Sequence, residues 1–233
     1  MGAIFKREFK AYFQNPIGYI FLAAFYFFLG LYFYIIYSAG SPDMYAVILS
    51  MSTVTVFAMP IITMRLMSED RRQKVDQALL TAPVKLTSIV LGKFFAALAL
   101  FAMGFIPTVI FEIVILSYLS VGLVAYIYSL FGIILLGGAL IAIGMFISSL
   151  TESPVVSAII SLIINFMALY MSSLADMVKV EWIKNIINKA AFMNAFESFG
   201  ESVFSVSNIV YFLSIIAAFL FLCVRSLEKR RWS

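Results

Sequence analysis

The sequence contains no histidine, a single cysteine and few charged residues. Without histidine, the chain lacks the most common metal ligand and the usual proton carrier near neutral pH. Its one cysteine, Cys223, cannot form a disulfide within the chain and lies in an apolar run, as a small buried hydrophobic residue would. Charged residues make up 12% of the 233 residues, against about 25% in a soluble domain. This scarcity of charge indicates an integral membrane protein.

Motifs for nucleotide binding and hydrolysis are also missing. The sequence contains no GxxxxGK[ST] loop, no HExxH pair and no GxSxG elbow. We therefore expect a chain that is not an enzyme and that holds no metal or cofactor of its own.

Long apolar runs dominate the rest of the chain, which is 64% hydrophobic. About 20 helical residues cross a hydrocarbon core of about 30 Å, whereas membrane strands would show short alternating segments. The runs predict a single all-α membrane domain over 1–233 with six transmembrane helices, and Pro107 is expected to bend or break the third. The expected spans are 17–38, 44–66, 88–119, 123–150, 155–175 and 208–224.

The first fifteen residues are too charged to cross a membrane but are amphipathic. Aromatic residues recur on one helical face, and the basic residues lie away from it. This pattern predicts an interfacial helix on the cytosolic leaflet. The aromatic positions are Phe5, Phe9, Tyr12 and Phe13.

The distribution of basic residues predicts the orientation. If both chain ends are cytosolic, 13 of the 16 Lys and Arg residues lie in cytosolic segments. Basic residues concentrate on the cytosolic side of membrane proteins, so we expect both termini inside.

The longest polar interruption is the segment 67–87, between the second and third spans. Ser68 is expected to cap a short amphipathic helix whose first turn holds Glu69 and Asp70, and Pro83 ends it. Such a helix between two spans either binds a soluble partner or is a solvated loop. Its candidate contact residues are Ser68, Glu69, Asp70, Arg71, Arg72, Lys74, Val75, Asp76, Leu79, Leu80 and Pro83.

Glu112 is the one acidic residue well inside a span, in the outer half of 88–119. If that span is broken at Pro107, the carboxylate reaches the membrane interface. Alternatively, Glu112 lines a substrate path, because acidic groups within membranes commonly mark such paths.

Several stretches together resemble one family. They are KREFKAYFQNPIGYI at 6–20, TMRLMSEDRRQKVDQALLTAPVKLTSIVLGKFFAAL at 63–98 and ESFGESVFSVSNIVYFLSIIAAFLFL at 197–222. With six spans, these stretches resemble ABC type-2 permeases, the membrane subunits of type V ABC exporters. They are most similar to the gliding-motility-associated, GldF-like branch.

The resemblance implies a role for each landmark. The helix at 68–80 would be the coupling helix that docks on a separate ATPase subunit, which binds ATP and Mg²⁺, while 1–15 would be the elbow helix. The segment 176–207 would form short re-entrant or amphipathic helices at the outer mouth. A second permease chain, identical or related, would complete an exporter in a bacterial cell membrane.

Two other functions remain open from the sequence. A membrane scaffold could recruit a cytosolic partner through 67–87 without transporting anything. An ion-coupled carrier is disfavoured, because such carriers place several ionisable groups within the membrane.

Overall fold

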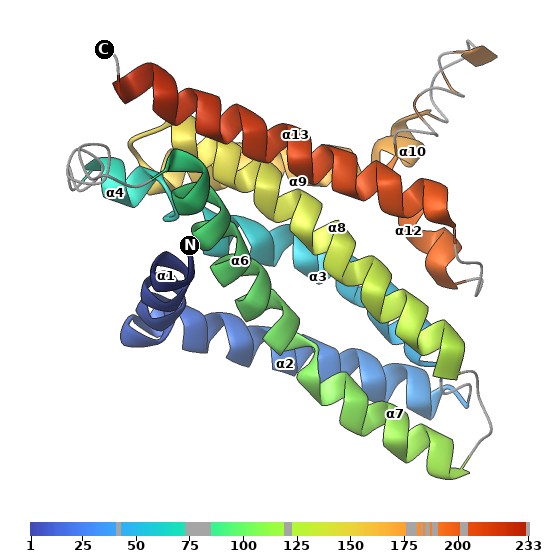
Figure 1. Ribbon diagram of the computed structural model, residues 1–233. Helices are drawn as coiled ribbons and strands as arrows, with labels where there is room; N and C mark the ends of the chain where they lie inside the picture. The colour runs from blue at the N-terminus through green and yellow to red at the C-terminus, as the bar shows by residue number, and fades with distance from the viewer. Residues whose placement is uncertain are drawn as a thin grey trace.

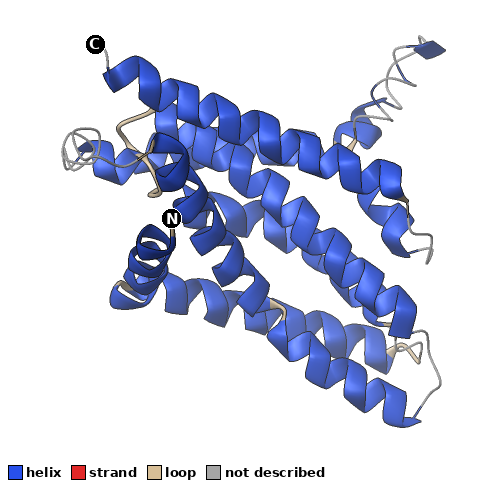
Figure 2. Cartoon of the chain, viewed as in Figure 1, coloured by secondary structure: helices blue, strands red, loops and turns tan. Residues whose placement is uncertain are grey.

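The computed structural model describes residues 1–40, 43–72, 85–118, 123–175, 181–182, 184, 187, 191–200 and 205–231. Within these residues the chain is helical and no strand occurs, so the expected all-α class is confirmed (Figure 2). The helices are α1 (Gly2–Gln14), α2 (Pro16–Ser38), α3 (Met44–Thr63), α4 (Ser68–Arg72), α6 (Leu86–Gly104), α7 (Ile106–Tyr118), α8 (Leu123–Leu150), α9 (Pro154–Leu169), α10 (Met171–Ala175), α12 (Phe192–Gly200) and α13 (Val206–Arg231).

Five helical stretches among the described residues are long and apolar enough to cross a membrane. They are Pro16–Ser38, Met44–Arg72, Leu86–Ser117, Leu123–Leu150 and Val206–Lys229. The fifth expected span, 155–175, is not among them, because it is divided: α9 has 16 residues and stops before Tyr170, after which α10 begins. A sixth span therefore stays a prediction.

The long helix α8 is the centre of the bundle, and α3, α6, α9, α12 and α13 pack around it (Figure 1). Glycines on α8 allow two of these neighbours to come close. A Cβ at Gly137 would overlap the ring of Phe101 on α6, and one at Gly144 would overlap the side chain of Thr63 on α3. Small residues allow this close packing of helices in lipid.

The third span is broken, as its proline predicts. α6 ends at Gly104 and α7 begins at Ile106, one residue before Pro107. Pro107 has no N–H to donate to the carbonyl of Met103, four residues earlier. At the break the N–H of Phe105 bonds three residues back, to the carbonyl of Ala102, at 3.1 Å.

The amino-terminal helix α1 packs against α6 and α2 (Figure 1). Its contact with α6 depends on Gly92, where a Cβ would lie 2.9 Å from Cγ2 of Ile4. Three expected aromatic residues follow one another along α1, with ring centroids 5.8 Å apart for Phe5 and Phe9 and 5.3 Å apart for Phe9 and Phe13. The fourth, Tyr12, differs because its hydroxyl donates to the carbonyl of Ile62 on α3, at 3.3 Å.

Both termini and α4 lie at the same end of the bundle (Figure 1). We call this the charged end, because the ion pairs of Arg7, Arg65, Arg71, Lys93 and Arg225 are found there. The functional candidates described next lie at this end.

Candidate functional site

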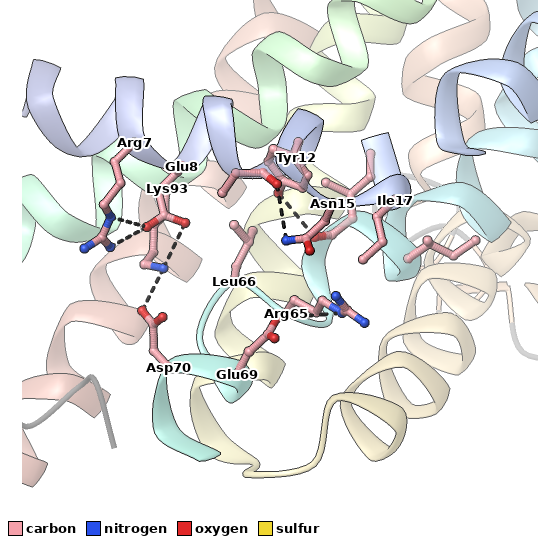
Figure 3. A pocket seen from close by; sticks show the side chains of 13 residues that line it. Arg7, Glu8, Tyr12, Asn15, Ile17, Arg65, Leu66, Glu69, Asp70 and Lys93 are labelled. Atoms are coloured by element: carbon pink, nitrogen blue, oxygen red, sulfur yellow. Dashed lines mark hydrogen bonds and ion pairs between the residues drawn. The ribbon is translucent and has the colours of Figure 1, made fainter. Parts of the chain in front are cut away.

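A buried lysine joins three helices at the charged end. Lys93, on α6, has a side chain only 1% exposed. Its ammonium lies 2.8 Å from Oδ2 of Asp70 on α4 and 3.2 Å from Oε2 of Glu8 on α1 (Figure 3). Burying an ammonium is costly unless carboxylates compensate it, so Glu8 on α1 and Asp70 on α4 both stabilise the buried charge of Lys93.

Glu8 also binds Arg7, its neighbour on α1. The guanidinium contacts Oε1 of Glu8 through Nη2 at 2.5 Å and through Nε at 3.2 Å. The hydrogen bonds to Glu8 raise the pKa of Arg7 above its usual value, so this cation stays charged. Arg7, Glu8, Asp70 and Lys93 are called the Lys93 cluster below.

A serine on α8 holds the turn between α3 and α4. Ser148 Oγ accepts hydrogen bonds from the backbone N–H groups of Met67, at 3.2 Å, and Ser68, at 3.0 Å. The same hydroxyl donates to the carbonyl of Met64, at 3.0 Å. Ser148 is fully buried and satisfies three backbone groups where regular helix geometry is interrupted.

The expected cap at Ser68 is wrong. Ser68 is the first residue of α4, and its hydroxyl donates back to the carbonyl of Met64. The chain from α3 into α4 keeps a helical turn, so Ser68 forms the backward bond of a serine inside a helix rather than a cap.

Arg71 attaches α4 to the turn between α8 and α9. Its Nη2 lies 2.7 Å from Oε1 of Glu152, and its Nη1 donates to the carbonyl of Leu150 at 3.1 Å. Together with Asp70 and the Ser148 contacts, this contact ties α4 directly to α6 and α8, and through Lys93 to α1.

Five of the expected contact residues are therefore at the charged end. Ser68, Asp70 and Arg71 contact other helices, Glu69 pairs with Arg65 at 3.7 Å, and Arg72 is exposed. The remaining six, Lys74, Val75, Asp76, Leu79, Leu80 and Pro83, lie outside the described residues.

A cavity of about 450 Å³ lies between α1, α3, α4 and α6 (Figure 3). Its ionisable lining is balanced, with the cations Arg7, Arg65 and Lys93 and the carboxylates Glu8, Glu69 and Asp70. Tyr12 also lines it, and burial, followed by the nearby charge of Glu8, raises the pKa of its hydroxyl. Among the described residues, no cluster of three or more His, Cys, Asp or Glu side chains could hold a metal ion. The arrangement can hold these helices in a fixed relation to one another.

The structure does not bring Glu112 to this site. Glu112 lies on α7, beyond the break at Phe105, with 4% of its surface exposed. It is buried within the bundle, and its role in a substrate path stays a prediction.

A family comparison identifies the chain. The model described as ABC-2 type transporter matches residues 1–199. The chain belongs to the ABC-2 type transporter family. A search of curated proteins finds no match. The ABC-2 match covers α1, α4, α6 and α8, and with them every residue of the Lys93 cluster.

Family membership establishes the broad class of this protein. ABC-2 membrane domains are the permease components of transporters and are typically non-catalytic. This chain is therefore a multi-pass membrane protein that belongs to a transport system. The GldF-like branch stays a prediction.

Sequence reasoning missed the most informative residue of this ABC-2 chain. In the sequence, Lys93 entered only the count of basic residues that predicts the orientation. A lone lysine within the apolar helix Leu86–Gly104 was nevertheless a visible sign of a functional or paired charge. It also missed a polar row on α9, formed by Ser157, Ser161 and Asn165. All three are fully buried without a hydrogen-bond partner among the described residues, and their spacing of four residues was visible in the sequence.

Proposed function

We propose that this chain is the membrane-spanning permease subunit of an ATP-driven exporter, coupled to a separate ATPase subunit. The ABC-2 family match supports the permease role. The observation that carries the coupling proposal is the attachment of α4 to α6 through Asp70 and to α8 through Ser148 and Arg71.

The ATPase partner would bind ATP and Mg²⁺ and press on α4 and the segment that follows it. Because Asp70 is paired with Lys93, and Lys93 with Glu8, displacement of α4 would move α1 and α6 with it. The contacts of Ser148 and Arg71 would pass the same displacement to α8, the centre of the bundle. Packed helices transmit small shifts as rigid bodies, which suits this mechanism.

Two such chains, identical or related, would pair around the transport path. One face of α9 supports a partner of this kind, because large apolar side chains there are exposed. They include Val155, Val156, Ile159, Ile163 and Met167. The charged end would face the cytoplasm of a bacterium, since basic residues concentrate on that side.

Affinity capture from native membranes tests the partner proposal. The tagged chain should retain an ATPase subunit, and a second permease chain beside it would indicate a heteromeric transporter. Recovery of the intact, folded chain without any ATPase would contradict the proposal and favour the scaffold function.

A variant in the Lys93 cluster tests the coupling proposal separately. Asp70→Asn removes the charge that pairs α4 with Lys93. We expect the ATPase still to bind while ATP-driven transport falls, because docking is kept and transmission is weakened. Lys10→Gln is the matched control, because it removes the charge of an exposed side chain on α1, and it should leave transport unchanged.

A further inference from the structure

An apolar groove runs along the bundle between α6 and α13, with α8 as its floor. Its volume is about 780 Å³, within the range of lipid-sized and drug-sized sites. Its apolar lining includes Leu91, Phe94 and Leu98 from α6, Gly138 from α8, and Leu213 and Ala217 from α13.

The groove is as deep as one membrane leaflet. On α6 its lining extends from Thr87 to Leu98, and the apolar part of its lining on α13 extends from Leu213 to Val224. At 1.5 Å per helical residue, each stretch covers roughly 17 Å, about half of a hydrocarbon core of about 30 Å. A single acyl chain of one leaflet would fit this depth.

The groove has one charged mouth, at the charged end. Arg225 and Glu228 line it there, and they are paired at 2.9 Å. The guanidinium of Arg225 also lies over the ring of Phe221, 5.2 Å from its centroid. Both side chains are well exposed, so their pair is weak and Arg225 can bind another anion.

Arg225 also lines a second hollow, of about 520 Å³. This hollow carries three cations, Arg71, Arg225 and Lys229, over an apolar base of Phe146, Leu150 and Leu222. No carboxylate is among the described residues that line it, although Glu152 pairs with Arg71 nearby. Arg225 is thus shared by an apolar groove and a basic hollow.

We propose that these two hollows bind one anionic glycerophospholipid from the leaflet at the charged end. One acyl chain would lie in the groove between α6 and α13, and the phosphate would contact Arg225 and Lys229. A zwitterionic lipid would gain less from the cations, and a free phosphate would leave the groove unused. Because Arg71 belongs to α4, the headgroup would lie beside the helix that the proposed function assigns to coupling, but lipid binding does not depend on that function.

Native mass spectrometry of the full chain tests this proposal. The chain is taken from nanodiscs that contain equal amounts of palmitoyl-oleoyl phosphatidylglycerol and phosphatidylcholine. We expect one phosphatidylglycerol to remain on the wild-type chain. Arg225→Gln and Lys229→Gln should each lower its retention about fivefold, as expected for basic residues near anionic lipid, whereas Lys10→Gln should not.

A pair of neighbouring alanines tests the groove itself. Ala217 lines the groove, whereas Ala218, the next residue of α13 and also exposed, does not. Ala217→Trp would occupy the space of the acyl chain and should abolish retention, and Ala218→Trp should retain the lipid. Thermal unfolding shows whether both variants fold. If either does not, the retention measured for Arg225→Gln still tests the proposal.

Three outcomes would overturn the proposal. Equal retention by Ala217→Trp and Ala218→Trp would show that the lipid is elsewhere. Phosphatidylcholine retained as strongly as phosphatidylglycerol would exclude the basic hollow as the headgroup site. The third outcome needs an Ala217→Cys variant in which the native Cys223 is replaced by alanine. A disulfide between two copies of this variant would show that a second chain covers the groove.

Discussion

Asp70 on α4 and Lys93 on α6 form an ion pair of 2.8 Å in which the lysine is 1% exposed and the aspartate 21% exposed. The lysine is therefore inside the protein, while its partner borders the surface. If α4 moves away, Lys93 still has Glu8 at 3.2 Å, so its charge is not left alone. Glu8 is similarly placed, with 14% of its side chain exposed, so two carboxylates at the border of the protein compensate one enclosed ammonium.

Lys93→Met should destabilise the protein and loosen both α1 and α4. The substitution keeps the length of the side chain but leaves Glu8 and Asp70 without their shared cation. Because these carboxylates are partly exposed, we expect the lower end of the cost of breaking a buried pair, about 3 kcal/mol. Thermal unfolding in detergent measures it, with Lys10→Met as the exposed control.

Neutralising the two carboxylates as well should restore the stability that Lys93→Met loses. A triple variant, Glu8→Gln, Asp70→Asn and Lys93→Met, removes the three charges that the pairings of Lys93 join, and an uncharged group can be as stable as a paired one. Arg7 keeps its charge, but its side chain is 49% exposed and water can solvate it. If the triple variant is no more stable than Lys93→Met alone, unpaired charge is not the cause of the loss.

Ser148→Ala should weaken the attachment of α4 to α8. It leaves the N–H groups of Met67 and Ser68 without their acceptor, a cost of about 1–3 kcal/mol. Ser129→Ala is the matched control, because Ser129 is equally buried on α8 but bonds within its own helix, to Ala125. Hydrogen exchange of α4 should rise in the first variant only, and equal exchange in both would contradict the role of Ser148.

Tyr12 should make the protein less stable at high pH. Burial raises the pKa of its hydroxyl in the folded protein, whereas an unfolded tyrosine titrates near about 10. Above that pH the unfolded chain loses the proton and the folded chain keeps it, so the free energy of unfolding falls by up to about 1.4 kcal/mol per pH unit. Tyr12→Phe should remove this part of the fall, and identical pH profiles would contradict it.

Asn165→Leu should leave the isolated chain as stable or make it more stable. Neither polar atom of its buried amide has a partner among the described residues, and an unsatisfied buried group costs about 1–3 kcal/mol. Asn208→Leu is the contrasting variant and should destabilise, because the amide of Asn208 donates to Ser198. A marked loss of stability in Asn165→Leu would contradict the prediction and show that the amide has a stabilising partner in the isolated chain.

The broad class of the protein followed from its sequence, because composition and run length determine it. Apolar runs of twenty residues or more can satisfy their backbone groups in lipid only as helices, so an all-α membrane protein was predictable. The break of the third span was predictable from Pro107, and the close approach of helices to α8 from its glycines.

The division of 155–175 at Tyr170 was not predictable, since the sequence has no proline or glycine at that point. The cap assigned to Ser68 also failed for a local reason. A serine before two acids fits both a helix start and a position inside a continuing helix, and only the path of the chain from α3 distinguishes them.

The sequence alone determined that this chain is a helical membrane protein of the ABC-2 type, and that its polar segment follows the second span. Only the tertiary structure decided that Glu8, Asp70 and Lys93 meet, because they lie on three helices whose rotation and depth are set by packing. Periodicity shows which face of one helix is polar, but not which faces of separate helices meet. A lone lysine in an apolar helix becomes a stable buried charge only through those contacts.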